Sequence, residues 1–350
     1  MCAVSMSEVY FQQPSPFVSV VIPALNCADD VQGFAEAILR QDYPAERFEV
    51  IVVDNGSSDD TFERARAAGF FTLLCEERGR TRALNVGLKA AKGEIVCTSD
   101  MSCRAVDHWI RTVVESFADP EVACVAGEIK LLKGGDDSPV IAFQERANYM
   151  SPMHAIRRNR LPFLPFADGA NASFRRKIFE EIGGFEESFI KGGDVEICYR
   201  LLTLTDYKLV FDFRALMWEP GEPNLGALLK QRFRMGIGWN LMRMKYPLIY
   251  EQRDQRSIKV AYWSFRAALK KARELLVDNI QALFGRQREA TYDANIRFLM
   301  KLMQSYGRIY GRWYLRRLGI APTPMNLVAQ QRLIERTAVD RVIVREKDVG

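Results

Sequence analysis

Short apolar runs alternate with helical patterns along the first half of the chain. Residues 18–22 and 48–53 form apolar runs rich in β-branched side chains, and a polar turn follows each of them. Between them, apolar side chains over residues 31–39 recur at helical spacing. Continuous rather than alternating apolarity is typical of parallel strands covered on both faces. The pattern therefore predicts an α/β fold, Rossmann-like, with a mostly parallel sheet and helices on both faces.

A third strand is predicted over residues 94–98, after a helix over residues 81–91. Residues 172–175 then form a strand-like stretch, and residues 177–182 a helical one. Polar clusters follow the first three strands, where ligands bind in open α/β sheets. These clusters are residues 24–26, 54–60 and 100–103. We expect them to lie on one rim of the sheet.

From residue 225 the apolar spacing is helical for most of a hundred residues. Two helices are predicted here, one from Ile258 to Leu276 and one from Ile296 to Trp313, with Gly285 between them. The chain is thus expected to have four parts. They are a leader over residues 1–16, an α/β domain over 17–224, a basic helical extension over 225–320 and a tail over 321–350.

Charge is divided unevenly between these parts. The net charge is +5, but the extension carries 20 Lys and Arg against 6 Asp and Glu, whereas residues 1–224 carry 24 against 34. This asymmetry suggests two regions with different partners. The seven cysteines show no CxxC spacing, which favours reduced thiols and a cytoplasmic location. No signal peptide or membrane-spanning run is visible.

Three carboxylates lie in turns that suit binding or catalysis. Asp54 and Asp100 each directly follow a predicted strand, and Asp194 precedes a helical pattern. At a sheet rim, such carboxylates can accept hydrogen bonds from a nucleoside or coordinate Mg²⁺ that bridges a diphosphate. Taken singly, each is better explained as an N-cap or an Asx turn. Their joint arrangement favours a shared site.

An ordered set of motifs resembles the family 2 glycosyltransferases, which have the GT-A fold. The motifs are VSVVIPALN at 18–26, EVIVVDNGSSDDT at 49–61, the segment 79–87, GEIVCTSD at 93–100, FADGANASFRRKIFEEIGGF at 166–185, GGDVEICYRL at 192–201 and LLKQRFRMGIG at 228–238. No single motif is decisive, but they follow the order of the family from about residue 17 to residue 245.

The resemblance implies an inverting enzyme with a nucleotide-sugar donor. Asp54 is expected to contact the nucleoside and Asp100 to face the diphosphate, while Asp194 takes the proton of the acceptor hydroxyl as general base. Glu196 is the alternative base. The remaining donor-binding residues are Pro23, Asn26, Arg82, Asn85 and Arg232, and the acceptor-side residues are Asp168, Gly169 and Asn171. Candidates to offset the charge of the leaving diphosphate are Arg80, Arg82, Arg232 and Arg234.

The metal-binding motif of the family is incomplete in this chain. Ser102 replaces the second carboxylate of the DxD motif, and Glu219 stands where many members carry a metal-binding histidine. Oxygen ligands from Asp100, Ser102 and Glu219 suit Mg²⁺ or Mn²⁺. The alternative is weak use of metal, with arginines supplying the countercharge.

The basic extension has two interpretations. Its second predicted helix carries Arg297, Lys301, Arg308, Arg312 and Arg316 beside Tyr310, Trp313 and Tyr314. Such a helix can lie on an anionic membrane, which predicts peripheral contact through residues 256–320 at the inner face of the membrane. The alternative is a helix packed on the catalytic domain with a solvated basic face. No nucleic-acid motif is present, and we expect no nucleic-acid partner.

The predicted function is transfer of a sugar from a UDP- or GDP-sugar to a hydroxyl of a glycan or lipid-linked sugar. One rival is a catalytically inactive, nucleotide-binding scaffold, which Ser102 and Gly193 favour because acidic residues are common at both positions. Joint retention of Asp54, Asp100 and Asp194 opposes it. A second rival is a sugar-phosphate nucleotidyltransferase, but PALN stands where those enzymes carry a Gly-rich phosphate loop.

Overall fold

The computed structural model describes residues 15–132, 134, 138–156, 163–254, 273, 279, 288–335 and 341–345. Most of the leader and the helix expected from Ile258 to Leu276 lie outside these residues. The part of the proposed membrane-contact region before residue 288 does so too, apart from two isolated positions.

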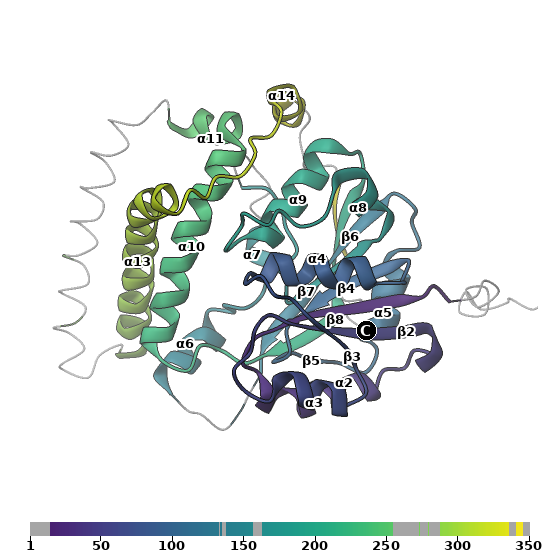
Figure 1. The fold of residues 1–350 in the computed structure, drawn as a ribbon. Coiled ribbons are helices and arrows are strands. Elements are labelled where there is room, and N and C mark those ends of the chain that lie inside the picture. The colour runs from purple at the N-terminus through teal and green to yellow at the C-terminus, as the bar shows by residue number, and fades with distance from the viewer. Residues whose placement is uncertain are drawn as a thin grey trace, which may run out of the picture.

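A mixed sheet forms the centre of the molecule (Figure 1). Its strands are β1 (Val18–Ala24), β2 (Phe48–Asp54), β3 (Phe71–Leu74), β4 (Ile95–Ser99), β5 (Arg104–Ala105), β6 (Val122–Leu131), β7 (Asn171–Arg175), β8 (Lys208–Glu219) and β9 (Val342–Arg345). They lie in the order β3-β2-β1-β4-β7-β6-β8-β5, and β9 also pairs with β8. The first four strands pair in parallel, whereas β7 is antiparallel to both of its neighbours.

Helices cover both faces of this sheet. On one face lie α2 (Val31–Leu39), α3 (Thr61–Ala67) and α5 (Trp109–Ser116), and on the other lie α4 (Arg80–Ala90), α8 (Lys177–Ile182) and α9 (Gly193–Leu204). Side chains of β1 alternate between the two cores: Val20 and Ile22 enter the first and Val21 the second. Both faces of β1 are therefore dry, which is why its sequence is continuously apolar.

The expected α/β architecture is confirmed. The strands expected near residues 18–22, 48–53 and 94–98 are β1, β2 and β4, and the strand-like stretch at 172–175 is β7. The antiparallel direction of β7 was not expected. Its direction depends on pairing with β4 and β6, which lie far from it in the sequence.

Further helices follow and flank the α/β layers. They are α6 (Pro139–Arg146), α7 (Met153–Ile156), α10 (Leu225–Lys245), α11 (Pro247–Asp254), α13 (Arg288–Leu318) and α14 (Leu327–Glu335). Figure 1 shows α10 and α13 side by side at the left of the sheet. A separate core joins α9 to α10, α11, α13 and α14. The expected helical extension is therefore present and is packed against the segment that contains Asp194.

The two long helices approach each other at glycines. A Cβ atom on Gly236 of α10 would collide with the carbonyl oxygen of Gln304, and one on Gly307 of α13 with that of Phe233. Because glycine has no Cβ, the two backbones can touch directly. One face of α13 is thus packed on α10, which is itself part of the extension and not of the α/β domain expected over residues 17–224.

The segment expected as a tail contributes to the sheet. Residues Val342–Arg345 form β9, which pairs in parallel with β8 from Leu209 to Asp212. The short apolar sequence VIVR gave too little pattern to predict a strand. Its pairing partner lies more than a hundred residues earlier in the chain.

The cysteines and the helix lengths of the described residues bear on two expectations, reduced thiols and no membrane-spanning run. Six cysteines are described, all of them free, and five of these are buried. None of the described helices is long and apolar enough to cross a membrane.

Candidate active site

Three turns meet at the carboxyl ends of the central strands. The Asn55 amide donates to the carbonyl oxygen of Ala24 at 2.9 Å, which joins the ends of β2 and β1. Asn26 has a left-handed backbone conformation with φ 52°. Its side-chain oxygen accepts from the backbone amide of Ser58 at 2.8 Å, and its backbone amide donates to Ser57 Oγ at 2.9 Å. Asn26 therefore fixes the two turns, and its side chain is not among those that line the cleft described below.

Asp54 is held rigidly and is only partly satisfied. Its Oδ1 accepts from the amides of Gly56 at 2.8 Å and Ser57 at 2.9 Å. Its Oδ2 is buried and has no hydrogen-bond partner among the described residues. A buried carboxylate oxygen without a hydrogen-bond donor costs free energy. Asp54 itself is not among the residues that line the cleft described below.

A cleft of about 310 Å³ lies over these turns. Its lining residues are Pro23, Ala24, Leu25, Cys27, Asp30, Asn55, Arg80, Asp100, Met101 and Ser102. The cleft therefore brings together Pro23, Asp100 and Ser102 of the expected donor and metal residues. Asn55 was not expected in it. Its side chain donates to the carbonyl oxygen of Glu77 at 2.8 Å and accepts from the Gly79 amide at 2.6 Å, which holds the start of α4.

Arg80, the first residue of α4, lies at the centre of the carboxylates. Its Nη2 is 2.7 Å from Asp100 Oδ1. Burial acts to lower the pKa of the Arg80 guanidinium, but the charges of Asp100, Asp194 and Asp168 outweigh it, and the pKa is raised. The side chain lines both the cleft and a second hollow next to Asp194. It therefore connects the expected donor side to the expected base.

Asp194 lies in the first turn of α9. The preceding Gly192 has φ 85°, a conformation that favours glycine, and lets the chain turn sharply into the helix. Asp194 Oδ2 accepts from the Gly169 amide at 3.2 Å, and Oδ1 accepts from the Val195 amide at 2.9 Å. The second hollow, of about 50 Å³, is lined by Asp194 and Gly169 together with apolar side chains such as Phe189.

Two further carboxyl groups carry shifted pKa values. Burial and the charge of Asp194 raise the pKa of Asp168 to about 6. Burial, with the charges of Asp168 and Asp100, raises the pKa of Glu219 well above its usual range. Asp100, Asp168, Asp194 and Glu219 thus act on one another electrostatically, although they come from four separate segments. Negative charge is in excess here, and a cation would relieve it.

The three expected metal ligands have side-chain atoms that suit a hard cation. Asp100, Ser102 and Glu219 offer only oxygen ligands, which Mg²⁺ and Mn²⁺ prefer. The described residues nevertheless contain no group of three or more His, Cys, Asp or Glu side chains arranged to hold a metal ion. Asp100 is paired with Arg80 instead.

Several expected site residues have other contacts. Arg82 forms ion pairs with Glu77 and Glu187. Asn85 is bonded through both ends of its amide to the backbone of Phe185, which ties α4 to the segment before α9. Neither side chain lines the cleft. At this end of α4 the arginine in the site is therefore Arg80 rather than Arg82.

Asn171 and Arg232 also contact the interior of the protein. The Asn171 side chain is buried and bonds Trp109, the carbonyl of Glu128 and the carbonyl of Ala215, so it joins β6, β7 and β8. The guanidinium of Arg232 lies 4.5 Å from the ring centre of Tyr149. Both residues have contacts that account for them structurally.

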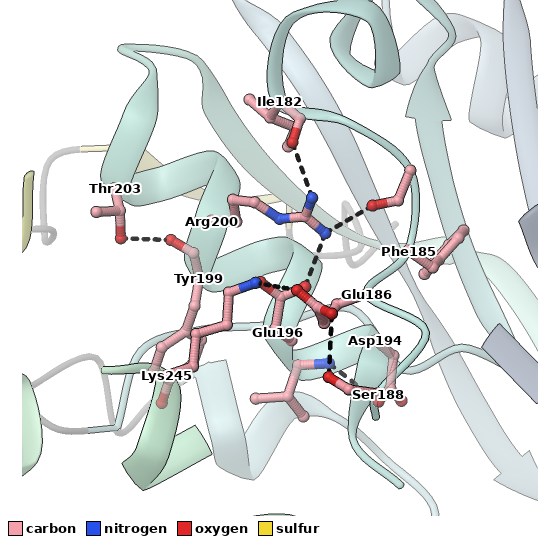
Figure 2. Close-up of polar contacts among 12 residues, drawn as sticks. Ile182, Phe185, Glu186, Ser188, Asp194, Glu196, Tyr199, Arg200, Thr203 and Lys245 are labelled. Atoms are coloured by element: carbon pink, nitrogen blue, oxygen red, sulfur yellow. Dashed lines mark hydrogen bonds and ion pairs between the residues drawn. The ribbon is translucent and has the colours of Figure 1, made fainter. Parts of the chain in front are cut away.

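The alternative base, Glu196, is buried and paired. Its side chain is 0% exposed, and it forms ion pairs with Arg200 at 2.7 Å and Lys245 at 3.1 Å (Figure 2). A general base must reach an acceptor hydroxyl. Glu196 is therefore poorly placed for that role, and Asp194 is the better candidate.

The fold is of the GT-A type, with a cleft at the carboxyl ends of the strands and carboxylates around Arg80. The sequence matches the models of Glycosyl transferase family 2 over residues 19–183 and of Glycosyl transferase family group 2 over residues 104–319. The chain belongs to the family 2 glycosyltransferases.

Two curated relatives illustrate the range of the similarity. Glycosyltransferase AglE of Haloferax volcanii is 31% identical in an alignment of 245 residues that covers 67% of this chain and 78% of AglE. Poly-beta-1,6-N-acetyl-D-glucosamine synthase of Staphylococcus epidermidis is 26% identical in an alignment of 256 residues that covers 67% of this chain and 60% of the synthase. The chain thus spans most of the first relative and a smaller share of the second.

A solved structure shows the same fold. Mannosyltransferase PcManGT from Pyrobaculum calidifontis, in complex with GDP-Man and Mn²⁺, superposes with a TM-score of 0.58 at 20% sequence identity. The superposition covers 87% of this chain and 92% of that chain. It supports the GT-A architecture, including helices beyond the sheet.

The raised pKa of Asp168 predicts a pH-dependent cost to stability. The folded chain holds this proton up to about pH 6, whereas the unfolded chain releases it near pH 4. The free energy of unfolding should therefore fall as the pH rises through this window. Asp168→Asn should be more stable than the wild type at pH 7.5, by about 1–3 kcal/mol. The difference should shrink at pH 5.

Urea denaturation in EDTA at the two pH values measures this difference. The exposed Asp60→Asn is the matched control and should follow the wild type at both. Equal stability of Asp168→Asn and the wild type at pH 7.5 would contradict the prediction.

Proposed function

We propose that this chain is an inverting glycosyltransferase in which Asp194 is the general base. The observation that carries the proposal is the position of Arg80, which lines both the donor-side cleft and the hollow at Asp194. A diphosphate at Asp100 and Arg80 would thereby lie next to the carboxylate that activates the acceptor. One step of transfer needs these two groups side by side.

The proposed reaction is a single in-line displacement. The acceptor oxygen attacks the anomeric carbon, the bond from that carbon to the diphosphate oxygen breaks, and the configuration inverts. Asp194 takes the proton of the acceptor hydroxyl, and the nucleoside diphosphate leaves. Hydrogen bonds from the Gly169 and Val195 amides hold the Asp194 carboxylate in place. Arg80 offsets the charge that develops on the leaving group.

We propose a UDP- or GDP-sugar as the donor. The buried Oδ2 of Asp54 lacks a donor group, and an N–H of a base or a hydroxyl of a ribose would satisfy it. PcManGT was solved with GDP-Man, which supports the guanosine alternative. The acceptor is proposed to be a glycan or lipid-linked sugar, since one relative is a poly-β-1,6-N-acetyl-D-glucosamine synthase. Release of UDP or GDP from a panel of nucleotide sugars identifies the donor.

We propose that Mg²⁺ or Mn²⁺ assists the reaction, held by Asp100, Ser102 and Glu219. The cation would supply positive charge to the diphosphate. The excess of carboxylates around Glu219 supports a cation site, and PcManGT was solved with Mn²⁺. If no metal is used, Arg80 is the first candidate for the countercharge.

Substitution of Asp194 tests the base. Asp194→Asn should bind UDP or GDP almost as the wild type does, while transfer falls by about 10²–10⁴, the usual contribution of a general base. Calorimetric nucleotide binding and nucleotide release in the presence of acceptor measure the two quantities. Glu63→Gln removes a first-turn carboxylate from α3 and is the control. Near-wild-type transfer by Asp194→Asn would refute the assignment.

Metal dependence tests the incomplete DxD motif. Activity should require Mg²⁺ or Mn²⁺, with a weaker apparent affinity than two motif carboxylates would give. Ser102→Asp should lower the metal concentration needed for half-maximal activity, Glu219→Gln should raise it, and Asp100→Asn should abolish transfer. Full activity after exhaustive EDTA treatment would contradict the metal site and favour the arginine countercharge.

We further propose that the outer face of α13 contacts an anionic membrane. Its exposed apolar side chains are Leu302, Tyr306, Ile309 and Trp313, spaced three or four residues apart. Each is more than half exposed, and the ring of Tyr306 also lies 5.5 Å from that of Phe233 on α10. Residues 294–318 contain six Lys and Arg and no Asp or Glu. An apolar stripe bordered by cations fits the interface of an anionic bilayer.

Vesicle binding tests this surface. The full chain should co-sediment with phosphatidylserine-containing vesicles at low salt, and added salt should weaken binding because exposed charges are screened. Ile309→Ser with Trp313→Ser should weaken it further. Leu39→Ser removes an equally exposed apolar side chain from α2 and should have no effect. If the wild type ignores these vesicles at low salt, α13 is only a packed helix with a solvated basic face.

A further inference from the structure

Helix α10 contacts the segment that contains Asp194, the proposed general base, at two separate points. At Gly238, a Cβ atom would lie 2.7 Å from the carbonyl oxygen of Lys191, so the helix lies against the backbone just before Gly192 and α9. At its last residue, Lys245, the side chain contacts Glu186 and Glu196. The loop and the first turn of α9 are thus both held from the same helix.

The contact at Lys245 is a buried network of balanced charge. Lys245 Nζ is 2.6 Å from Glu186 Oε2 and 3.1 Å from Glu196 Oε1, and its side chain is 6% exposed. The other oxygen of Glu196 pairs with Arg200 at 2.7 Å, and the Tyr246 hydroxyl also donates to Glu196 at 3.2 Å. Two carboxylates therefore meet two cations (Figure 2), with Glu196 fully buried, Lys245 6% exposed and Glu186 half-buried.

The network joins three elements around the active site. Glu196 lies on α9, two residues after Asp194. Glu186 lies in the loop that contributes Phe185, Phe189 and Ile190 to the hollow beside Asp194. Arg200 donates to the backbone carbonyls of Ile182 at 2.8 Å and Gly184 at 2.7 Å, at the start of that loop. Lys245 and Tyr246 are the members of the network that come from the helical extension, and Lys245 is the one that carries a charge.

We infer that Lys245 is a positioning residue for the general base. By pairing with both Glu196 and Glu186, it fixes the first turn of α9 relative to the loop that faces Asp194. This rests on the proposed role of Asp194. A shift of about 1 Å in a reacting group can lower a rate by about 10²-fold. The helical extension is therefore needed for catalysis through this contact, apart from any surface that it offers to a partner.

A set of variants at Lys245 separates positioning from stability. Lys245→Met should lower the kcat of transfer at least about 10-fold at temperatures where it is folded, with UDP or GDP affinity changed less than about two-fold. Lys245→Arg, which keeps a cation between the two carboxylates, should retain most of the activity. In the Asp194→Asn background, Lys245→Met should cause little further loss, because residues that act as a unit are not additive.

Two further variants test whether a loss of kcat comes only from lower stability of the protein. Lys245→Met with Glu196→Gln removes one charge of each sign, so the buried network stays balanced, and the same loss of kcat is expected. Asn240→Ala is the matched control. This buried α10 side chain bonds the carbonyl of Arg308 on α13 and should affect the melting temperature without lowering kcat.

The outcomes are distinct. Wild-type kcat in folded Lys245→Met, or a loss that multiplies fully with that of Asp194→Asn, would overturn the positioning role while leaving the base assignment intact. Near-wild-type transfer by Asp194→Asn alone would instead count against the base, whatever Lys245 does.

Discussion

The carboxylates around Arg80 share a half-buried space with a substrate that is itself negatively charged. Asp100, Asp168 and Glu219 already raise one another's energy before any diphosphate enters. Such carboxyl groups either keep a proton, as the raised pKa values of Asp168 and Glu219 indicate, or need positive charge nearby. Arg80 supplies part of it from the first turn of α4. The position of α4, and of the Asn55 contacts that fix its start, therefore controls how much charge the site can tolerate.

The same constraint divides the site into two sides. The proposed donor side is built from turns after β1, β2 and β4, whose backbone groups are hydrogen-bonded and leave one oxygen of Asp54 without a partner. The proposed acceptor side is built from loops and the start of α9, which pack with the helical extension. A family can vary the second side without disturbing the first.

The sequence predicted the parts that local patterns control. Strands β1, β2 and β4 are dry on both faces, so their apolarity is continuous and easily recognised. Asp54, Asp100 and Asp194 stand next to strand ends or a helix start, where position follows from the element itself. Arg80 and Arg82 could not be separated in this way, because which of two neighbours on α4 faces the cleft depends on the rotation of the helix.

Long-range contacts explain the other differences. Asn85 and Asn171 belong to family motifs, yet their amides bond backbone groups about a hundred and about forty residues away. From the sequence alone, Glu196 is a second candidate for the general base, because its ion pair with Lys245 of α10 is visible only in the structure. None of these pairings leaves a periodic signal. Motifs therefore predicted which segments form the site, while the cleft in the structure shows which of their side chains line it.

Strand β9 has a consequence for how the chain folds. It covers the first half of one edge of β8, while β5 covers the second half. Until β9 is synthesised, that stretch of β8 presents unpaired backbone groups, which readily pair with strands of other molecules. Closing so long a loop is also slow, since distant contacts form late. Chains interrupted before residue 342 should therefore be prone to aggregate during synthesis, even though the donor-side turns are already encoded in them.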